Sequence, residues 1–116
     1  MSNILVVDDD ENTLMSQEAL LEDAGYHTTT AWGAEEGVRA IESGHFDLVL
    51  LDDYLPGADS EALMNQANAA HVPVVMLSTR RVPLNAKIGN IEAVCKWEPE
   101  EIREKVDGIL AMQHAA

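Results

Sequence analysis

The sequence is poor in aromatic residues, in cysteine and in basic side chains. Only 4% of its 116 residues are aromatic, so aliphatic side chains must fill any core. Cys95 is the single cysteine, which excludes an internal disulfide and suits a reducing compartment; its apolar neighbours favour a packed core thiol over a redox residue. Seven Lys and Arg against 21 Asp and Glu give a net charge of −14, which argues against direct binding to nucleic acid or to an anionic membrane.

Long apolar runs and glycine-rich loops are also missing. No apolar stretch approaches the roughly 18 residues that a membrane span needs, and the N-terminus lacks the basic leader of a signal peptide. We therefore expect a soluble, cytoplasmic protein. The lack of a glycine-rich phosphate loop argues against a dinucleotide-binding fold of the usual kind. The length and the 47% hydrophobic content predict one domain, residues 1–116.

Apolar runs alternate with segments of helical periodicity along the whole chain. Strands are expected at residues 3–8, 27–31, 47–52, 73–77 and 91–95, and helices at residues 11–24, 33–43, 59–70 and 99–112. Strands and helices that alternate with short connections predict an α/β fold with a parallel sheet covered on both faces. Between Ser78 and Lys96, Pro83 and Gly89 interrupt any helix, so a fourth helix is expected to be very short or missing.

Reactive polar groups follow four of the apolar runs. The runs end, in chain order, in Asp8-Asp9, Asp52, Ser78 and Lys96. Ligands of open parallel sheets bind at the carboxyl ends of the strands. If these runs belong to one sheet, three carboxylates, a hydroxyl and an ammonium converge at one edge. Such a site suits a metal cation and a phosphoryl group.

Simpler interpretations exist for each residue taken alone. The acidic pair can cap a helix, and the other residues can be ordinary turn or solvated residues. Asp8, Asp10 and Asn12 match the first ligand positions of a calcium loop, but Thr13 replaces the required Gly and Ala19 the required Glu. We therefore reject the calcium loop and favour Mg²⁺, which takes one or two carboxylates together with phosphate and water.

Taken together, these segments resemble the receiver domain of two-component response regulators. The matching segments are residues 4–9, 47–52, 55–57, 74–78 and Lys96. The resemblance implies a flavodoxin-like, doubly wound, five-stranded parallel sheet of order 2-1-3-4-5. It implies that Asp52 accepts a phosphoryl group from a sensor histidine kinase or a histidine phosphotransfer protein, and that Ser78 and Lys96 hold this group. It further implies Mg²⁺ as cofactor, with ligands from Asp8, Asp9, Asp52 and the backbone carbonyl of Tyr54.

The sequence departs from the family pattern near Lys96. Trp97 follows it where the family has a proline, usually with a cis peptide; because a cis non-proline bond costs about 3 kcal/mol, we expect a trans bond here. Ala93 stands at the position of the family's aromatic switch residue. Asp53 adds a carboxylate beside Asp52 and strengthens the need for a cation. The short segment 79–90 changes the face that most receivers use for output and dimerisation.

Three functions remain open on the sequence. The leading hypothesis is a phosphorylatable receiver, not an enzyme beyond its own phosphorylation and slow dephosphorylation, with an unknown downstream protein and with a homodimer left open. The second is a pseudo-receiver, a protein-interaction module that does not use phosphate. The third, a metal-dependent phosphatase, is weak because Tyr54 stands where such enzymes have a second Asp. Tyr54 and Arg80 are expected to slow dephosphorylation, and Trp32 and Trp97 suit either interface anchors or packing on the sheet rim.

Overall fold

The computed structural model describes residues 2–53, 55 and 60–113. Its elements, in chain order, are β1 (Asn3–Val7), α1 (Glu11–Asp23), β2 (His27–Ala31), α2 (Ala34–Ser43), β3 (Leu48–Asp52), α3 (Ser60–Ala69), β4 (Val74–Ser78), β5 (Lys87–Ile88), β6 (Ile91–Cys95) and α4 (Pro99–Gln113). The five strands and four helices expected from the sequence are present. The expected ligand Tyr54 and residues 56 and 57 lie outside the described residues.

The strands form one sheet in the order β2-β1-β3-β4-β6-β5. Neighbouring strands from β2 to β6 are parallel, which confirms the predicted flavodoxin-like order. The sequence did not predict β5, a two-residue edge strand that pairs antiparallel with β6. Gly89 opens the loop between them with φ 63°, a conformation that glycine adopts without steric cost.

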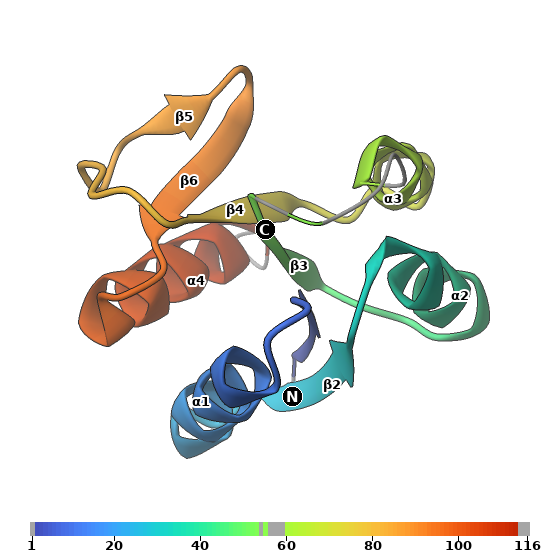
Figure 1. The fold of residues 1–116 in the computed structure, drawn as a ribbon, viewed down its shortest axis with the longest axis horizontal. Helices are drawn as coiled ribbons and strands as arrows, with labels where there is room; N and C mark the ends of the chain where they lie inside the picture. Colours follow the sequence, from blue (N-terminus) through green and yellow to red (C-terminus); the bar gives the residue numbers. More distant parts are fainter. Residues whose placement is uncertain (1, 54, 56–59, 114–116) are drawn as a thin grey trace.

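Alternating side chains of the central strands build two core layers. Ile4 and Val6 of β1 face the layer that contains α1 and α4, whereas Leu5 and Val7 face the layer that contains α2 and α3. Figure 1 shows these two pairs of helices on opposite faces of the sheet. All five residues of β3 are buried because both of its faces are covered. The apolar runs of the sequence are therefore explained by burial on two sides.

No helix occupies residues 79–90, all of which are described. The buried Lys105 of α4 reaches this segment instead: its Nζ donates to the carbonyl of Leu84 at 2.6 Å and lies 2.7 Å from Glu92 of β6. Lys87 of β5 lies 3.4 Å from the other Glu92 oxygen. Hydrogen bonding to Lys105, against a smaller opposing effect of burial, lowers the pKa of Glu92. These contacts tie the β5–β6 hairpin to the last helix.

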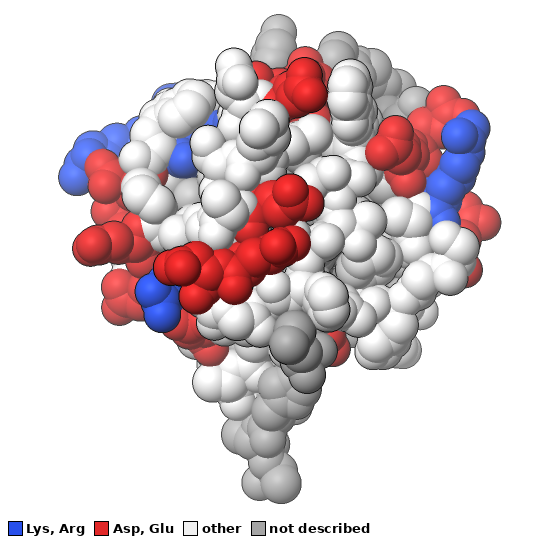
Figure 2. Space-filling view, turned by 90° about the horizontal axis from the view of Figure 1, so that it is seen from below, with Lys and Arg blue, Asp and Glu red and all other residues white. Residues whose placement is uncertain are grey.

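The surface of the molecule is acidic. Figure 2 shows one face on which Asp and Glu side chains are spread widely, whereas Lys and Arg lie toward its two sides. None of the helices in the described ranges is long and apolar enough to cross a membrane.

Candidate functional site

The parallel register brings the four predicted strand ends to one edge of the sheet. Val7 of β1 is level with Leu51 of β3, and Ser78 of β4 is level with Cys95 of β6. The residues that follow β1 and β6 therefore lie beside the last residues of β3 and β4. Strand pairing alone thus gathers the side chains that the sequence singled out.

Three carboxylates form a compact acidic cluster at this edge. Oxygens of Asp8, Asp9 and Asp52 lie within 4.8 Å of one another. Asp8 and Asp52 are buried, whereas Asp9 is exposed. Carboxylate oxygens with one open side match the needs of Mg²⁺, which binds through one or two carboxylates and keeps several waters. The described residues therefore fit a magnesium site.

Helix capping falls to Asp10 rather than to the two acidic residues before it. Asp10 accepts a hydrogen bond from the backbone of Asn12 at 3.0 Å and from the hydroxyl of Thr13 at 3.2 Å. Asp8 binds the backbone N–H of Asp10 at 2.9 Å with one oxygen only. Its other oxygen lies 2.6 Å from the ammonium of Lys96. Simple capping consequently leaves the clustering of Asp8 and Asp9 unexplained.

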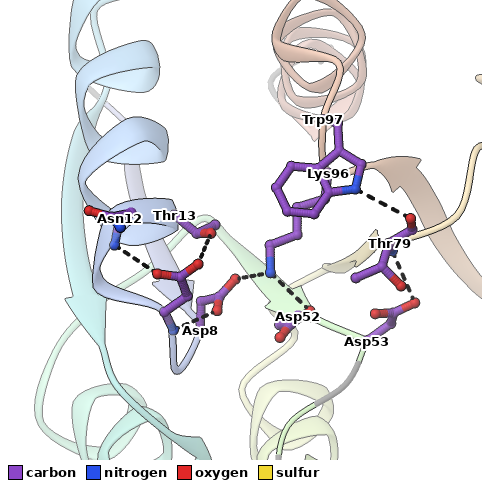
Figure 3. Close-up of polar contacts among 9 residues, drawn as sticks. Asp8, Asn12, Thr13, Asp52, Asp53, Thr79, Lys96 and Trp97 are labelled. Atoms are coloured by element: carbon purple, nitrogen blue, oxygen red, sulfur yellow. Dashed lines mark hydrogen bonds and ion pairs between the residues drawn. The ribbon is translucent and has the colours of Figure 1, made fainter.

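The ammonium of Lys96 lies between two of the carboxylates (Figure 3). Its Nζ is 2.6 Å from Asp8 and 3.4 Å from Asp52, and its side chain is buried. Burial by itself lowers the pKa of Lys96, but the adjacent Asp8 and Asp52 outweigh it and raise the pKa. Lys96 is therefore a buried cation. Of its two carboxylate partners, Asp8 is the closer.

Ser78 is buried at the end of β4 and combines a site position with a turn role. Its Oγ accepts the backbone N–H of Arg80 at 3.1 Å, and its carbonyl accepts the backbone N–H of Lys96 at 2.8 Å. The second bond fixes the spacing between Ser78 and Lys96. The hydroxyl hydrogen remains available to donate to an oxygen in the site.

The structure around Lys96 confirms two expectations, the trans bond to Trp97 and the buried thiol of Cys95. The described residues contain no cis peptide, so the bond from Lys96 to Trp97 is trans. Cys95 is buried, as expected for a packed core thiol. Ala93 is fully buried in β6 and offers no aromatic ring at the switch position. Trp32 and Trp97 are each 60% exposed, so neither is packed into the core.

Asp53, Thr79 and Trp97 form a second row of contacts beside the site, which we did not predict from the sequence. The indole Nε1 of Trp97 donates to the carbonyl of Thr79 at 3.3 Å, and the N–H of Thr79 donates to Asp53 at 3.4 Å. Figure 3 shows this chain beside Lys96 and Asp52. The signal was present in the sequence, because each of these residues directly follows one that the strand ends had identified.

Comparisons with known proteins agree with this geometry. A family model described as the response regulator receiver domain matches residues 4–106. The chain is 30% identical, over 97% of its length, to the alkaline phosphatase synthesis transcriptional regulatory protein PhoP of Bacillus subtilis, of which it spans 50%. It is 27% identical, over 77% of its length, to the transcriptional regulatory protein AfsQ1 of Streptomyces coelicolor, of which it spans 40%. The chain thus covers half or less of these curated relatives.

Solved structures give the same result. A CheY-like receiver domain protein from Methanospirillum hungatei is 28% identical with a TM-score of 0.82, and the match covers 97% of this chain and 96% of that one. The response regulator TrrA of Thermotoga maritima, solved with Mg²⁺ and BeF, is 27% identical with a TM-score of 0.79, over 94% of this chain and 99% of that one. Sequence, sheet order and strand-end residues agree, and the chain belongs to the response regulator receiver domain family.

Proposed function

We propose that the chain is a phosphoacceptor receiver of a two-component system, in which Asp52 takes a phosphoryl group in a Mg²⁺-dependent reaction. One observation carries the proposal: the Lys96 ammonium lies against Asp8 and Asp52 inside a cluster of three carboxylates. One ammonium balances only part of the charge of three carboxylates, so a divalent cation suits the remainder. The TrrA structure, a relative that was solved with Mg²⁺ and BeF, supports this choice of metal.

Asp52, Lys96 and Ser78 have separate roles in the transfer. An oxygen of Asp52 forms a new bond to phosphorus while the P–N bond of a donor phosphohistidine breaks, and the imidazole leaves with the electron pair and takes up a proton. Lys96 offers its ammonium to a phosphoryl oxygen, and Ser78 offers its hydroxyl. Asp8, Asp9, Asp52 and the backbone carbonyl of Tyr54 would hold Mg²⁺, which would neutralise the charge of the carboxylates and of the phosphoryl oxygens.

The donor in this proposal is a sensor histidine kinase or a histidine phosphotransfer protein. The sensor protein GacS of Pseudomonas syringae, 34% identical over 65% of this chain, supports a role in such a system. The acidic surface favours a protein as the downstream partner, with no direct binding to nucleic acid or membrane. The setting of this exchange is the cytoplasm.

Phosphorylation can be tested with phosphoramidate, a small donor with a P–N bond. The protein is incubated with the donor and Mg²⁺, and its intact mass is measured. We expect a gain of one phosphoryl group, with no gain in Asp52→Ala or after chelation of the metal. An unchanged mass of the wild type, or an equal gain in Asp52→Ala, would refute the proposal.

A pseudo-receiver remains the second candidate. It is favoured by the buried Ala93 at the switch position and by the β5 hairpin in place of a fourth helix. A pseudo-receiver would bind its partner equally well after Asp52→Ala. A receiver of the proposed kind would bind its partner differently with and without phosphate, and Asp52→Ala would remove that difference.

A further inference from the structure

We infer that Trp97 and Asp53 are positioning residues for phosphoryl transfer: together they hold Lys96 and Ser78 against Asp52. The inference rests on the proposed function and goes beyond it, because it assigns roles to two residues outside the acceptor, its metal ligands and its two phosphate contacts.

The chain of contacts follows the order of the site itself. Asp52, Ser78 and Lys96 end or follow three adjacent strands, and the next residues along the chain are Asp53, Thr79 and Trp97. The backbone of Thr79 is held at two points, since Asp53 accepts its N–H and Trp97 donates to its carbonyl. The row of reacting residues is therefore backed by a second row that ties the same three strand ends together (Figure 3).

The ammonium of Lys96 also lies over the ring of Trp97. The Lys96 Nζ lies 5.5 Å from the centroid of the indole ring, within the range in which a ring face attracts a cation. The same indole is anchored by its N–H to Thr79, so the ring cannot turn away without breaking that bond. This contact orients the flexible side chain of Lys96, which pairs with Asp8 and Asp52 before transfer and binds the phosphoryl group afterwards.

The hydrogen bond from the Thr79 N–H to Asp53 also affects Ser78. The N–H of Thr79 belongs to the peptide group that joins it to Ser78, so holding this group limits the directions in which the Ser78 hydroxyl can point. The Ser78 hydroxyl oxygen also accepts the N–H of Arg80, which closes a tight turn around Thr79. Asp53 and Trp97 hold the outside of this turn.

Trp97 variants test the contact with Lys96. Phosphorylation of each variant by phosphoramidate and Mg²⁺ is followed by intact mass, and the maximal rate is separated from the donor concentration at half-saturation. Trp97→Leu removes both the ring and the N–H, and we expect its maximal rate to fall about tenfold. Trp97→Phe keeps a ring under the ammonium, and we expect a loss of about threefold. Trp32→Phe, at an equally exposed tryptophan, is the matched control and should leave the rate unchanged.

Asp53 variants test the hydrogen bond without a difference in charge. Asp53→Asn and Asp53→Ala both remove the carboxylate, but only Asn retains an oxygen that can accept from Thr79. We expect Asp53→Ala to react about threefold more slowly than Asp53→Asn. In addition, Asp53→Ala should shift the indole N–H resonance of Trp97 in a nitrogen-15 correlation spectrum more than that of Trp32.

The outcomes separate the two proposals. If the wild type gains a phosphoryl group and Trp97→Leu reacts at the same maximal rate, the positioning role is wrong while the proposed function stands. If Trp97→Phe is as slow as Trp97→Leu, the ring contact with Lys96 is wrong. If the wild type gains no phosphoryl group, both proposals fail. Thermal unfolding followed by circular dichroism checks that each variant is folded, and the 60% exposure of Trp97 favours folding of its variants.

Discussion

Lys105 should be one of the residues on which the stability of this fold depends most. Its side chain is only 7% exposed, yet its ammonium is bound by the Leu84 carbonyl at 2.6 Å and by Glu92 at 2.7 Å. Lys105→Met keeps most of the aliphatic packing and removes both contacts. A hydrogen bond from a charged group contributes about 1.5–3 kcal/mol. The ion pair adds about 0.5 kcal/mol, since the Glu92 side chain is one-third exposed and screened by water.

We therefore expect Lys105→Met to lower the free energy of unfolding by about 2–3.5 kcal/mol. The assay is urea unfolding followed by far-ultraviolet circular dichroism, with thermal melting as a second measure. For a domain of this size the loss corresponds to a fall in Tm of about 8–14 °C. Arg103→Met is the control, because its ion pair with Asp107 spans 3.9 Å on the exposed face of the same helix. A loss below about 0.5 kcal/mol in Lys105→Met, equal to that of the control, would refute the reasoning.

Three further predictions use other parts of the structure. Asp9→Ala should weaken Mg²⁺ binding, measured by calorimetry, without lowering stability in the absence of metal, since Asp9 is exposed and adds only repulsion to the acidic cluster; a clear loss of metal-free stability would contradict this. Gly89→Ala should destabilise by about 1 kcal/mol because of its φ of 63°, whereas Gly108→Ala, inside α4 with open space around its Cβ, should stabilise by about as much; urea unfolding should give opposite signs. The lowered pKa of Glu92 contributes stability that is present above its ordinary value of 4.5 and is lost as the pH falls through the folded value; the stability difference between the wild type and Lys105→Met should therefore shrink at acid pH, and a constant difference would exclude Glu92 as its cause.

Much of the fold could be predicted because buried parallel strands leave a direct trace in the sequence. Residues 48–51 of β3 are all apolar because both faces of the strand are covered. In the helices that cover these faces, the apolar residues recur with helical periodicity. The strand β5 leaves no such trace. Its two residues, Lys87 and Ile88, are too few to show an alternation of apolar and polar side chains. They form a strand only through pairing with β6.

The site could also be predicted in part from the positions of the strands. Placing polar residues at strand ends located the acidic cluster and Lys96, because the ends of adjacent parallel strands must lie side by side. The preference of Lys96 for Asp8 over Asp52 depends on side-chain reach across the sheet, which sequence spacing does not specify. The Thr79 contacts were missed for another reason: Asp53, Thr79 and Trp97 directly follow the strand-end residues, but the contacts at Thr79 use backbone groups that every residue carries, so the sequence marks the positions and not the bonds.

The β5–β6 hairpin also affects how the protein behaves at high concentration. Without β5, β6 would end the sheet with a row of unpaired backbone groups, the kind of edge on which another chain can add a strand. The two residues of β5 cover the beginning of this edge, and Lys87 places a charge there. A short, charged, antiparallel edge is a poor template for further pairing. The segment that replaces a helix thus also protects this edge of the sheet against pairing with another chain.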